Sequence, residues 1–220
     1  QRVVYNKVKR IIIILFLLPT FFVSAQKIGE MAPEKPPAVF PPYAWGVDLM
    51  FSDGGFGIGT FFRRSINTKF AGFVDFSFTE SKNSREFEYY DYWGRPISVG
   101  KENRVFLLPL TFGLQYRLFE KELSDNLRPY LNAGVGPSFA ISTPYNVEFF
   151  NSFKYAKFQY GFGGYIGFGA DFGLSKTNLI GLSLKYQYTK FVTDGVEHMK
   201  GQIKTEISAF YIAIKVGLMF

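Results

Sequence analysis

The chain offers few side chains for catalysis, because its 220 residues include a single histidine and no cysteine. That histidine, His198, lies in the segment TDGVEHMKGQ, and nothing in the sequence fixes a serine or an acid as its partner. Acid–base and nucleophilic catalysis usually need such a pair, and a lone histidine cannot build a metal site. We therefore predict no enzyme, no metal and no cofactor. A membrane-embedded lipid-modifying enzyme is the alternative if a serine or acid lies within hydrogen-bond reach of His198.

The stretch GFGGYIGFG, residues 161–169, is superficially similar to a phosphate-binding glycine loop. Its spacing does not fit, because Ile166 stands where the third glycine is needed, and no helix follows to offer its N-terminus to a phosphate. We interpret these glycines as the small face of a strand, which makes room for Tyr and Arg side chains from the far wall of a barrel.

Six charged residues fall on the polar faces of strand-like segments and could meet inside a barrel. They are Asp48, Asp75, Arg117, Asp171, Lys185 and Lys215. Three acids and three bases predict a charge-compensated plug, because a buried charge without a partner is very unfavourable. An ion or proton path is the functional alternative. If the first and last strands pair, Asp48 and Lys215 should be neighbours.

Eight strand-like runs would position these charges. From residue 44 onward apolar and polar residues alternate with a period of two, without helical periodicity of comparable length. The runs are 44–52, 55–64, 70–80, 104–119, 128–143, 157–174, 179–192 and 204–220. Pro109 and Pro137 lie inside two of them. Because proline removes a ladder hydrogen bond, we interpret the two prolines as one shared bulge or kink in neighbouring strands.

The apolar faces of these runs are too large for the inside of a small barrel. The chain contains 27 Phe, 14 Tyr and 22 Gly, and each run has one face rich in large apolar residues. An eight-stranded lumen is just filled by side chains, so the large faces should point into lipid. The sheet must then be closed, because an open edge in hydrocarbon leaves backbone groups unpaired. The predicted fold is all-β: an eight-stranded antiparallel transmembrane up-and-down β-barrel.

The first 43 residues predict export. Residues 1–25 combine the basic stretch RVVYNKVKR, a short apolar run and small residues before a cleavage point, which is typical of a secretory signal peptide. An uncleaved anchor helix is the alternative, although the run is short for a membrane span. Residues 26–43 are proline-rich and predict an extended periplasmic leader, and 44–220 form the barrel domain. Four basic residues of the signal peptide contribute to the net charge of +7, so this charge does not indicate a nucleic-acid partner.

Connection lengths predict the orientation of the barrel. The connections at one end would be 53–54, 81–103, 144–156 and 193–203, and those at the other end 65–69, 120–127 and 175–178. Three of the first four are longer than any of the second set. In bacterial outer-membrane barrels the long loops are extracellular, so we expect both termini of the barrel in the periplasm.

The residues Ser-Ala before Gln26, the pair VFLLPLTFGLQYRL and RPYLNAGVGPSF, and a C-terminal Phe resemble the small outer-membrane β-barrel family. That family includes OmpX/OmpA-type barrels and the PorT-like barrels of Gram-negative secretion systems. The resemblance implies a place in the bacterial outer membrane among lipid and lipopolysaccharide. It also implies that the barrel-assembly machinery recognises the last strand. The residues of this assembly signal would be Phe220, Leu218, Val216, Ile214 and Ile212.

The predicted loop SKNSREFEYYDYWGRPISVGK combines aromatic and charged residues, as contact surfaces do. The candidate contact residues are Arg85, Phe87, Tyr89, Tyr90, Tyr92, Trp93 and Arg95. An aromatic girdle at the lipid boundary is the alternative, and the arginines could also bind lipopolysaccharide phosphates. We expect a barrel with a filled lumen and a structural or interaction role, in envelope integrity, surface binding or secretion, with a possible protein partner at these loops. A narrow or gated small-solute pore is the alternative function.

Overall fold

The computed structural model describes residues 40–82, 88–90, 92–93, 96–98, 100–120, 123, 127–172 and 177–220. The predicted signal peptide, residues 1–25, and residues 26–39 of the predicted leader lie outside this part of the chain. The last leader residue, Tyr43, already belongs to the first strand, so the barrel begins one residue earlier than the alternation predicts.

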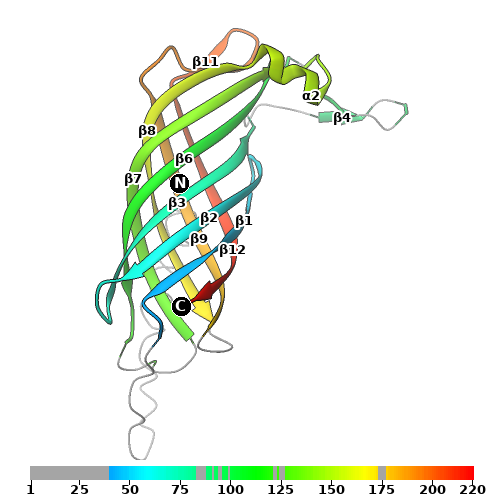
Figure 1. Ribbon diagram of the computed structural model, residues 1–220. Helices are drawn as coiled ribbons and strands as arrows, with labels where there is room; N and C mark the ends of the chain where they lie inside the picture. Colours follow the sequence, from blue (N-terminus) through cyan, green and yellow to red (C-terminus); the bar gives the residue numbers. More distant parts are fainter. Residues whose placement is uncertain are drawn as a thin grey trace, which may run out of the picture. The chain divides into compact units, whose positions relative to one another are not determined.

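Eight antiparallel strands close into a barrel whose wall is strongly tilted (Figure 1). The strands are β1 (Tyr43–Ser52), β2 (Gly55–Ser65), β3 (Phe70–Ser81), β6 (Asn103–Arg117), β7 (Leu127–Pro144), β8 (Lys157–Phe172), β9 (Asn178–Phe191) and β12 (Glu206–Met219). Each strand pairs with the next one in this series, and β12 pairs with β1. The predicted fold class is confirmed. Within the part that the structure describes, no helix is long and apolar enough to cross a membrane.

Short elements occupy the longer connections, all at one end of the barrel, which we call the long-loop end. They are β4 (Glu88–Tyr90), β5 (Pro96–Ser98), α2 (Phe149–Ser152), the 3-10 helix η2 (Phe153–Tyr155), β10 (Val196–Met199) and β11 (Gln202–Lys204). Alternation does not predict these elements, because they are only three or four residues long. The opposite end, which we call the short-turn end, carries Tyr43 and Phe220.

The wall confirms the predicted alternation of large outward and small inward side chains. On β9, for example, Leu184 is 53% exposed and its neighbour Ser183 is 1% exposed. The same contrast separates Ile212 from Ala213 on β12. Side chains of successive strand residues point to opposite faces, so the barrel presents a continuous apolar outer surface. Such a surface is stable in lipid and is the mark of a transmembrane barrel.

Of the bulge or kink predicted at the two prolines, the bulge is absent. The pairing of β6 with β7 has the same register on both sides of the prolines, at Pro109↔Ser138 and at Phe112↔Val135. The two positions between these pairs are not paired, and one of them is Pro137. A bulge would insert an extra residue in one strand, whereas proline only removes an N–H donor. The ladder therefore opens locally without shifting.

Inward glycines accommodate aromatic rings from the neighbouring strand, not from the far wall as the sequence suggested. Gly113 is paired with Phe73, and a Cβ at Gly113 would lie 2.5 Å from the Phe73 ring. Gly169 is paired with Tyr130, and a Cβ there would lie 2.6 Å from the Tyr130 hydroxyl. An aromatic ring covering a glycine on the adjacent strand is a known way to stabilise curved sheets.

The two ends of the described chain close the barrel wall. Tyr43 N–H donates to the Phe220 carbonyl at 3.0 Å, and Phe220 N–H donates to the Tyr43 carbonyl at 2.9 Å. Their rings stack with centroids 5.9 Å apart. The final aromatic residue thus completes the seam between β1 and β12. The five residues of the predicted assembly signal all lie exposed on the outer face of this seam; their recognition by assembly machinery stays a prediction.

Candidate functional site

A buried lysine joins strands on different sides of the lumen. Lys185 on β9 donates from Nζ to Asp48 Oδ2 on β1 at 2.9 Å and to Asp75 Oδ2 on β3 at 2.8 Å. Tyr165 on β8 donates its hydroxyl to the same Asp75 oxygen at 3.0 Å. A low-dielectric interior strengthens such charge-assisted bonds. Four strands are therefore connected across the middle of the barrel.

Lys215 completes this group, which we call the central cluster: Asp48, Asp75, Tyr165, Lys185 and Lys215. Asp48 and Lys215 are paired across the β1–β12 seam, as the sequence predicted for neighbouring end strands. Lys215 Nζ lies 3.9 Å from Asp48 Oδ2 and 4.8 Å from the centroid of the Phe61 ring. Two carboxylates and two ammonium groups balance, so the central cluster has no net charge.

Asp171 and Arg117 do not belong to the central cluster, although the sequence placed all six charged residues in one network. Asp171 accepts a hydrogen bond of 2.6 Å from Arg63 Nη1, which also donates to Gln115 Oε1 at 3.0 Å. Arg117 Nη2 donates to the backbone carbonyl of Leu123 at 2.9 Å. The reason is axial position: these residues lie near the ends of their strands at the short-turn end.

Two buried arginines at this end were missed by the sequence reasoning, Arg63 on β2 and Arg128 on β7. The alternation contains the signal for both. Arg63 lies on the same inward face as Gly59, and Arg128 lies on the same inward face as Tyr130. Each arginine stands at the border of its run, where a charge is easily assigned to a turn. We call Arg63, Arg117, Arg128 and Asp171 the mouth cluster.

A layer of aromatic side chains separates the two clusters. Phe61 lies two residues before Arg63 on β2, and Tyr130 lies two residues after Arg128 on β7. On β3, Phe73 is paired with Arg63 and lies two residues before Asp75, and all three aromatic residues are buried. Their rings reduce the access of water between the two groups of charges. The lumen is therefore layered along its axis.

An apolar layer closes the lumen at the long-loop end. It contains Val105, Leu107, Ala140, Phe191, Val196 and Ile207. Val196 comes from the short strand β10, and its neighbour His198 is almost fully buried as well. His198 thus lies in the connection between β9 and β12, as the sequence predicted, and it is buried there on β10. Among the described residues, no three His, Asp or Glu side chains gather as possible metal ligands.

The predicted contact loop is described only in part. Arg85, Phe87 and Arg95 lie outside the described residues, and Tyr89 and Tyr90 contribute to the backbone of β4. Tyr92 and Trp93 are 95% and 76% exposed, and their rings contact edge to face with centroids 5.5 Å apart. Two large aromatic side chains exposed to this degree are unusual for a surface without a partner.

A second aromatic group, which the sequence reasoning missed, lies on α2 and η2. Phe149 contacts Phe150 and Phe153 with centroids 5.2 and 5.4 Å apart, and Phe153 stacks on Phe106 of β6 at 6.1 Å. Phe150 projects from this base and is largely exposed. The run EFFNSFKY contains the signal, because its aromatic residues are spaced by one and three positions, as on one helical turn.

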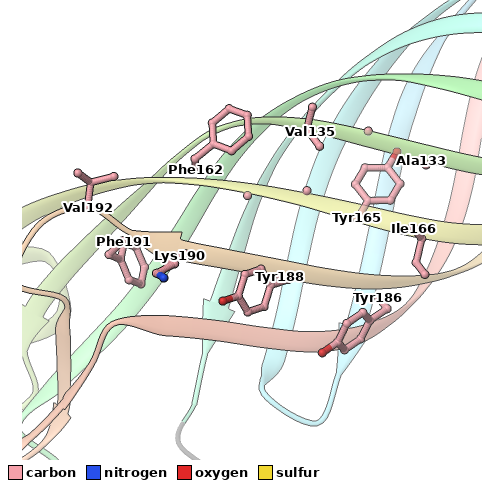
Figure 2. Close-up of a pocket in the computed structure, with 13 residues that line it drawn as sticks. Ala133, Val135, Phe162, Tyr165, Ile166, Tyr186, Tyr188, Lys190, Phe191 and Val192 are labelled. Atoms are coloured by element: carbon pink, nitrogen blue, oxygen red, sulfur yellow. The ribbon is translucent and has the colours of Figure 1, made fainter.

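The outer wall carries an apolar groove of about 860 Å³ between β7, β8 and β9 (Figure 2). Gly164 lies between the outward side chains Phe162 and Ile166, so a side chain is missing from the middle of the wall. Tyr188 borders the groove, and Lys190 lies at its edge. The lining of the groove is mostly apolar.

Neither a family model nor a curated protein matches the chain, but several solved structures do. The neisserial surface protein A NspA superimposes with a TM-score of 0.52 at 13% identity, covering 83% of this chain and 100% of that chain. The N-terminal β-barrel domain of Pseudomonas aeruginosa OprF has a TM-score of 0.44 at 13% identity, covering 82% and 98%. Ail, the attachment invasion locus protein of Yersinia pestis, has a TM-score of 0.43 at 15% identity, covering 81% and 96%.

The likeness to NspA shows a shared fold and nothing about a shared ligand. It agrees with the geometry on the two features that define the architecture, the closed antiparallel barrel and its apolar outer surface. The chain thus has the fold of the small eight-stranded outer-membrane β-barrels.

Proposed function

We propose that this protein is an outer-membrane β-barrel that does not conduct solutes and acts as an anchored interaction protein of the cell envelope. The observation that carries the first half is the filled lumen. Lys185 connects Asp48 and Asp75 across the middle of the barrel, and an apolar layer lies between this point and the long-loop end. An eight-stranded barrel has room for its own side chains and little more.

The second half of the proposal rests on the exposed aromatic residues of the long connections. Tyr92, Trp93 and Phe150 are exposed on elements that join strands at the long-loop end. Aromatic residues are enriched where proteins contact proteins. We place this end outside the cell and both barrel termini in the periplasm, since long loops are extracellular in bacterial barrels. The partner we propose is a protein, with lipid and lipopolysaccharide surrounding the wall.

Conductance in planar lipid bilayers tests the filled lumen. We expect the purified barrel to give no stepwise currents under conditions in which a general porin conducts. Regular steps would favour the alternative of a narrow or gated pore. The variant Thr79→Trp locates any current, because Thr79 is fully buried on the inner face of β3. If the conductance steps become smaller in this variant, the current passes through the lumen. The proposal of a non-conducting barrel would then be wrong.

Cross-linking followed by affinity capture from gently solubilised outer membranes tests the contact surface. We expect a stoichiometric protein partner for the wild-type barrel and its loss in the double variant Tyr92→Ser, Trp93→Ser. The matched control is Lys200→Ser, because Lys200 is exposed at the same end of the barrel. Recovery of only lipopolysaccharide and assembly machinery would contradict the interaction role and leave a purely structural one.

A further inference from the structure

The mouth cluster borders a cavity that the proposed function does not use. The cavity lies at the short-turn end and has a volume of about 370 Å³. Tyr130 lines its inner part, and Phe40, Pro41 and Pro42 line it from the segment that precedes β1. All four residues of the mouth cluster face it. A phosphate or a carboxylate group is much smaller than this volume.

Among the described residues that line the cavity, positive charges outnumber negative ones. Arg63, Arg117 and Arg128 contribute three guanidinium groups, and Asp171 is the single carboxylate among the described residues that line the cavity. Lys69 adds a further positive charge at the border. Buried charges are normally paired, because removing an ion from water is unfavourable. The central cluster obeys this rule. In the mouth cluster Arg63 has Asp171 and Arg117 is attracted by Glu120 outside the lining, whereas Arg128 forms no salt bridge with a described carboxylate.

Arg128 is the residue in which this imbalance is most acute, since its side chain is enclosed and only 8% of the residue is exposed. Its Nη1 and Nη2 both lie 3.4 Å from the Met219 thioether, which is a weak acceptor. The Phe40 ring lies 4.0 Å from its guanidinium carbon. Its buried Nε has no hydrogen-bond partner among the described residues. An arginine has five N–H donors, and no oxygen of the described residues accepts from this one.

We propose that the mouth cavity is an oxyanion site, which binds a phosphate or carboxylate group through Arg128 and Arg117. Arg117 Nε is also buried without a hydrogen-bond partner among the described residues, so both arginines carry unused donors. The planar fork of an arginine binds such oxyanions with two parallel hydrogen bonds. Arg63 already holds Asp171 and supports the site by its charge. This site is independent of whether the lumen conducts or the loops bind a partner.

The source that we propose for this oxyanion is a soluble phosphate or carboxylate compound on the short-turn side of the membrane. Either group presents two or more oxygens to the arginines.

Arginine side-chain NMR of the refolded barrel in detergent micelles tests the site, with inorganic phosphate as the probe and chloride at matched ionic strength as the reference. The Nε–Hε signals of Arg128 and Arg117 are expected to shift on addition of phosphate in a saturable manner. We expect Arg128→Met to bind phosphate about tenfold more weakly or worse, the loss typical of a charge-assisted hydrogen bond. The matched control Lys190→Met removes an exposed positive charge on the outer wall and should bind as the wild type does.

A saturable shift of the Arg128 and Arg117 signals in the wild type, weakened in Arg128→Met, would support the oxyanion site. The proposal is wrong if phosphate leaves both signals unchanged, or if Arg128→Met binds as tightly as the wild type. Should Arg128→Met not fold, the milder variant Arg117→Gln takes its place, and phosphate binding as tight as that of the wild type would again contradict the proposal.

Discussion

The central cluster and the mouth cluster are both groups of charged residues inside one barrel, yet they differ in how their charges are paired. In the central cluster each carboxylate faces an ammonium group, and the oxygen Asp75 Oδ2 accepts from both Lys185 and Tyr165. In the mouth cluster only Arg63 is bonded to Asp171, while Arg128 and Arg117 form no salt bridge with a described carboxylate. The charges of the first group balance without any other molecule, although Asp48 Oδ1 has no hydrogen-bond partner among the described residues. The second has donors and positive charge in excess, beside a cavity that can admit an acceptor.

This difference separates charges that serve the fold from charges that serve a ligand. Pairing buried ions rarely adds stability over apolar packing, but it fixes which strands lie opposite each other. The central cluster joins β1, β3, β8 and β9 and so specifies the closed arrangement. A group with excess positive charge specifies the closed barrel less well, since repulsion between its arginines opposes closure. Such an arrangement is maintained more readily if binding is its role.

Removal of the central lysine should have the largest effect. Lys185→Met leaves Asp48 and Asp75 buried with only the more distant Lys215, and breaking a buried pair on one side typically destabilises by about 3–5 kcal/mol. The measurement is reversible urea unfolding in lipid or detergent, followed by tryptophan fluorescence. The control Lys190→Met lies on the same strand, is exposed, and should change stability by no more than about 0.5 kcal/mol. Equal effects of the two variants would show that the central cluster has no structural role.

The sequence predicts the wall of this barrel better than its contents. Strands such as β9 alternate without interruption, because one face contacts lipid and the other a narrow lumen. Successive residues are therefore alternately large and apolar or small and polar. The turn between β1 and β2 was placed correctly for the same reason. Proline is the exception: Pro109 and Pro137 open the ladder without the bulge that their chemistry suggested.

The lumen and the ends are less predictable, because alternation gives the face of a residue but not its level along the axis. Asp171 and Lys185 both point inward, yet they belong to different clusters, since strand tilt and register decide which residues reach the same level. Arg128 was missed because it is the second residue of its strand, where a charge is easily assigned to the preceding turn. The aromatic group around Phe149 depends on a single helical turn, which is too short to produce a period.

A matched pair of arginine variants sharpens the comparison within the mouth cluster. Arg63→Met removes the hydrogen-bonded partner of Asp171, with its contact of 2.6 Å. We expect a loss of about 2–3 kcal/mol, the value of a hydrogen bond to a charged group. This is less than for Lys185→Met, because Arg63 is bonded to one carboxylate and Lys185 to two. The same urea unfolding measurement in chloride buffer applies.

Arg128→Met should change stability in chloride buffer by no more than about 0.5 kcal/mol, or increase it. The substitution removes a positive charge that Asp171 attracts and that Arg63 and Arg117 repel. This charge forms no salt bridge with a described carboxylate, and methionine keeps apolar contact with Phe40 and Met219. Arg63 and Arg128 are equally buried, at 8% exposure each, so burial alone predicts equal losses. A loss for Arg128→Met as large as that for Arg63→Met would mean that this arginine holds the fold together through its packing. A small loss combined with lost phosphate binding would mean that the barrel keeps Arg128 for a ligand, since the fold does not depend on it.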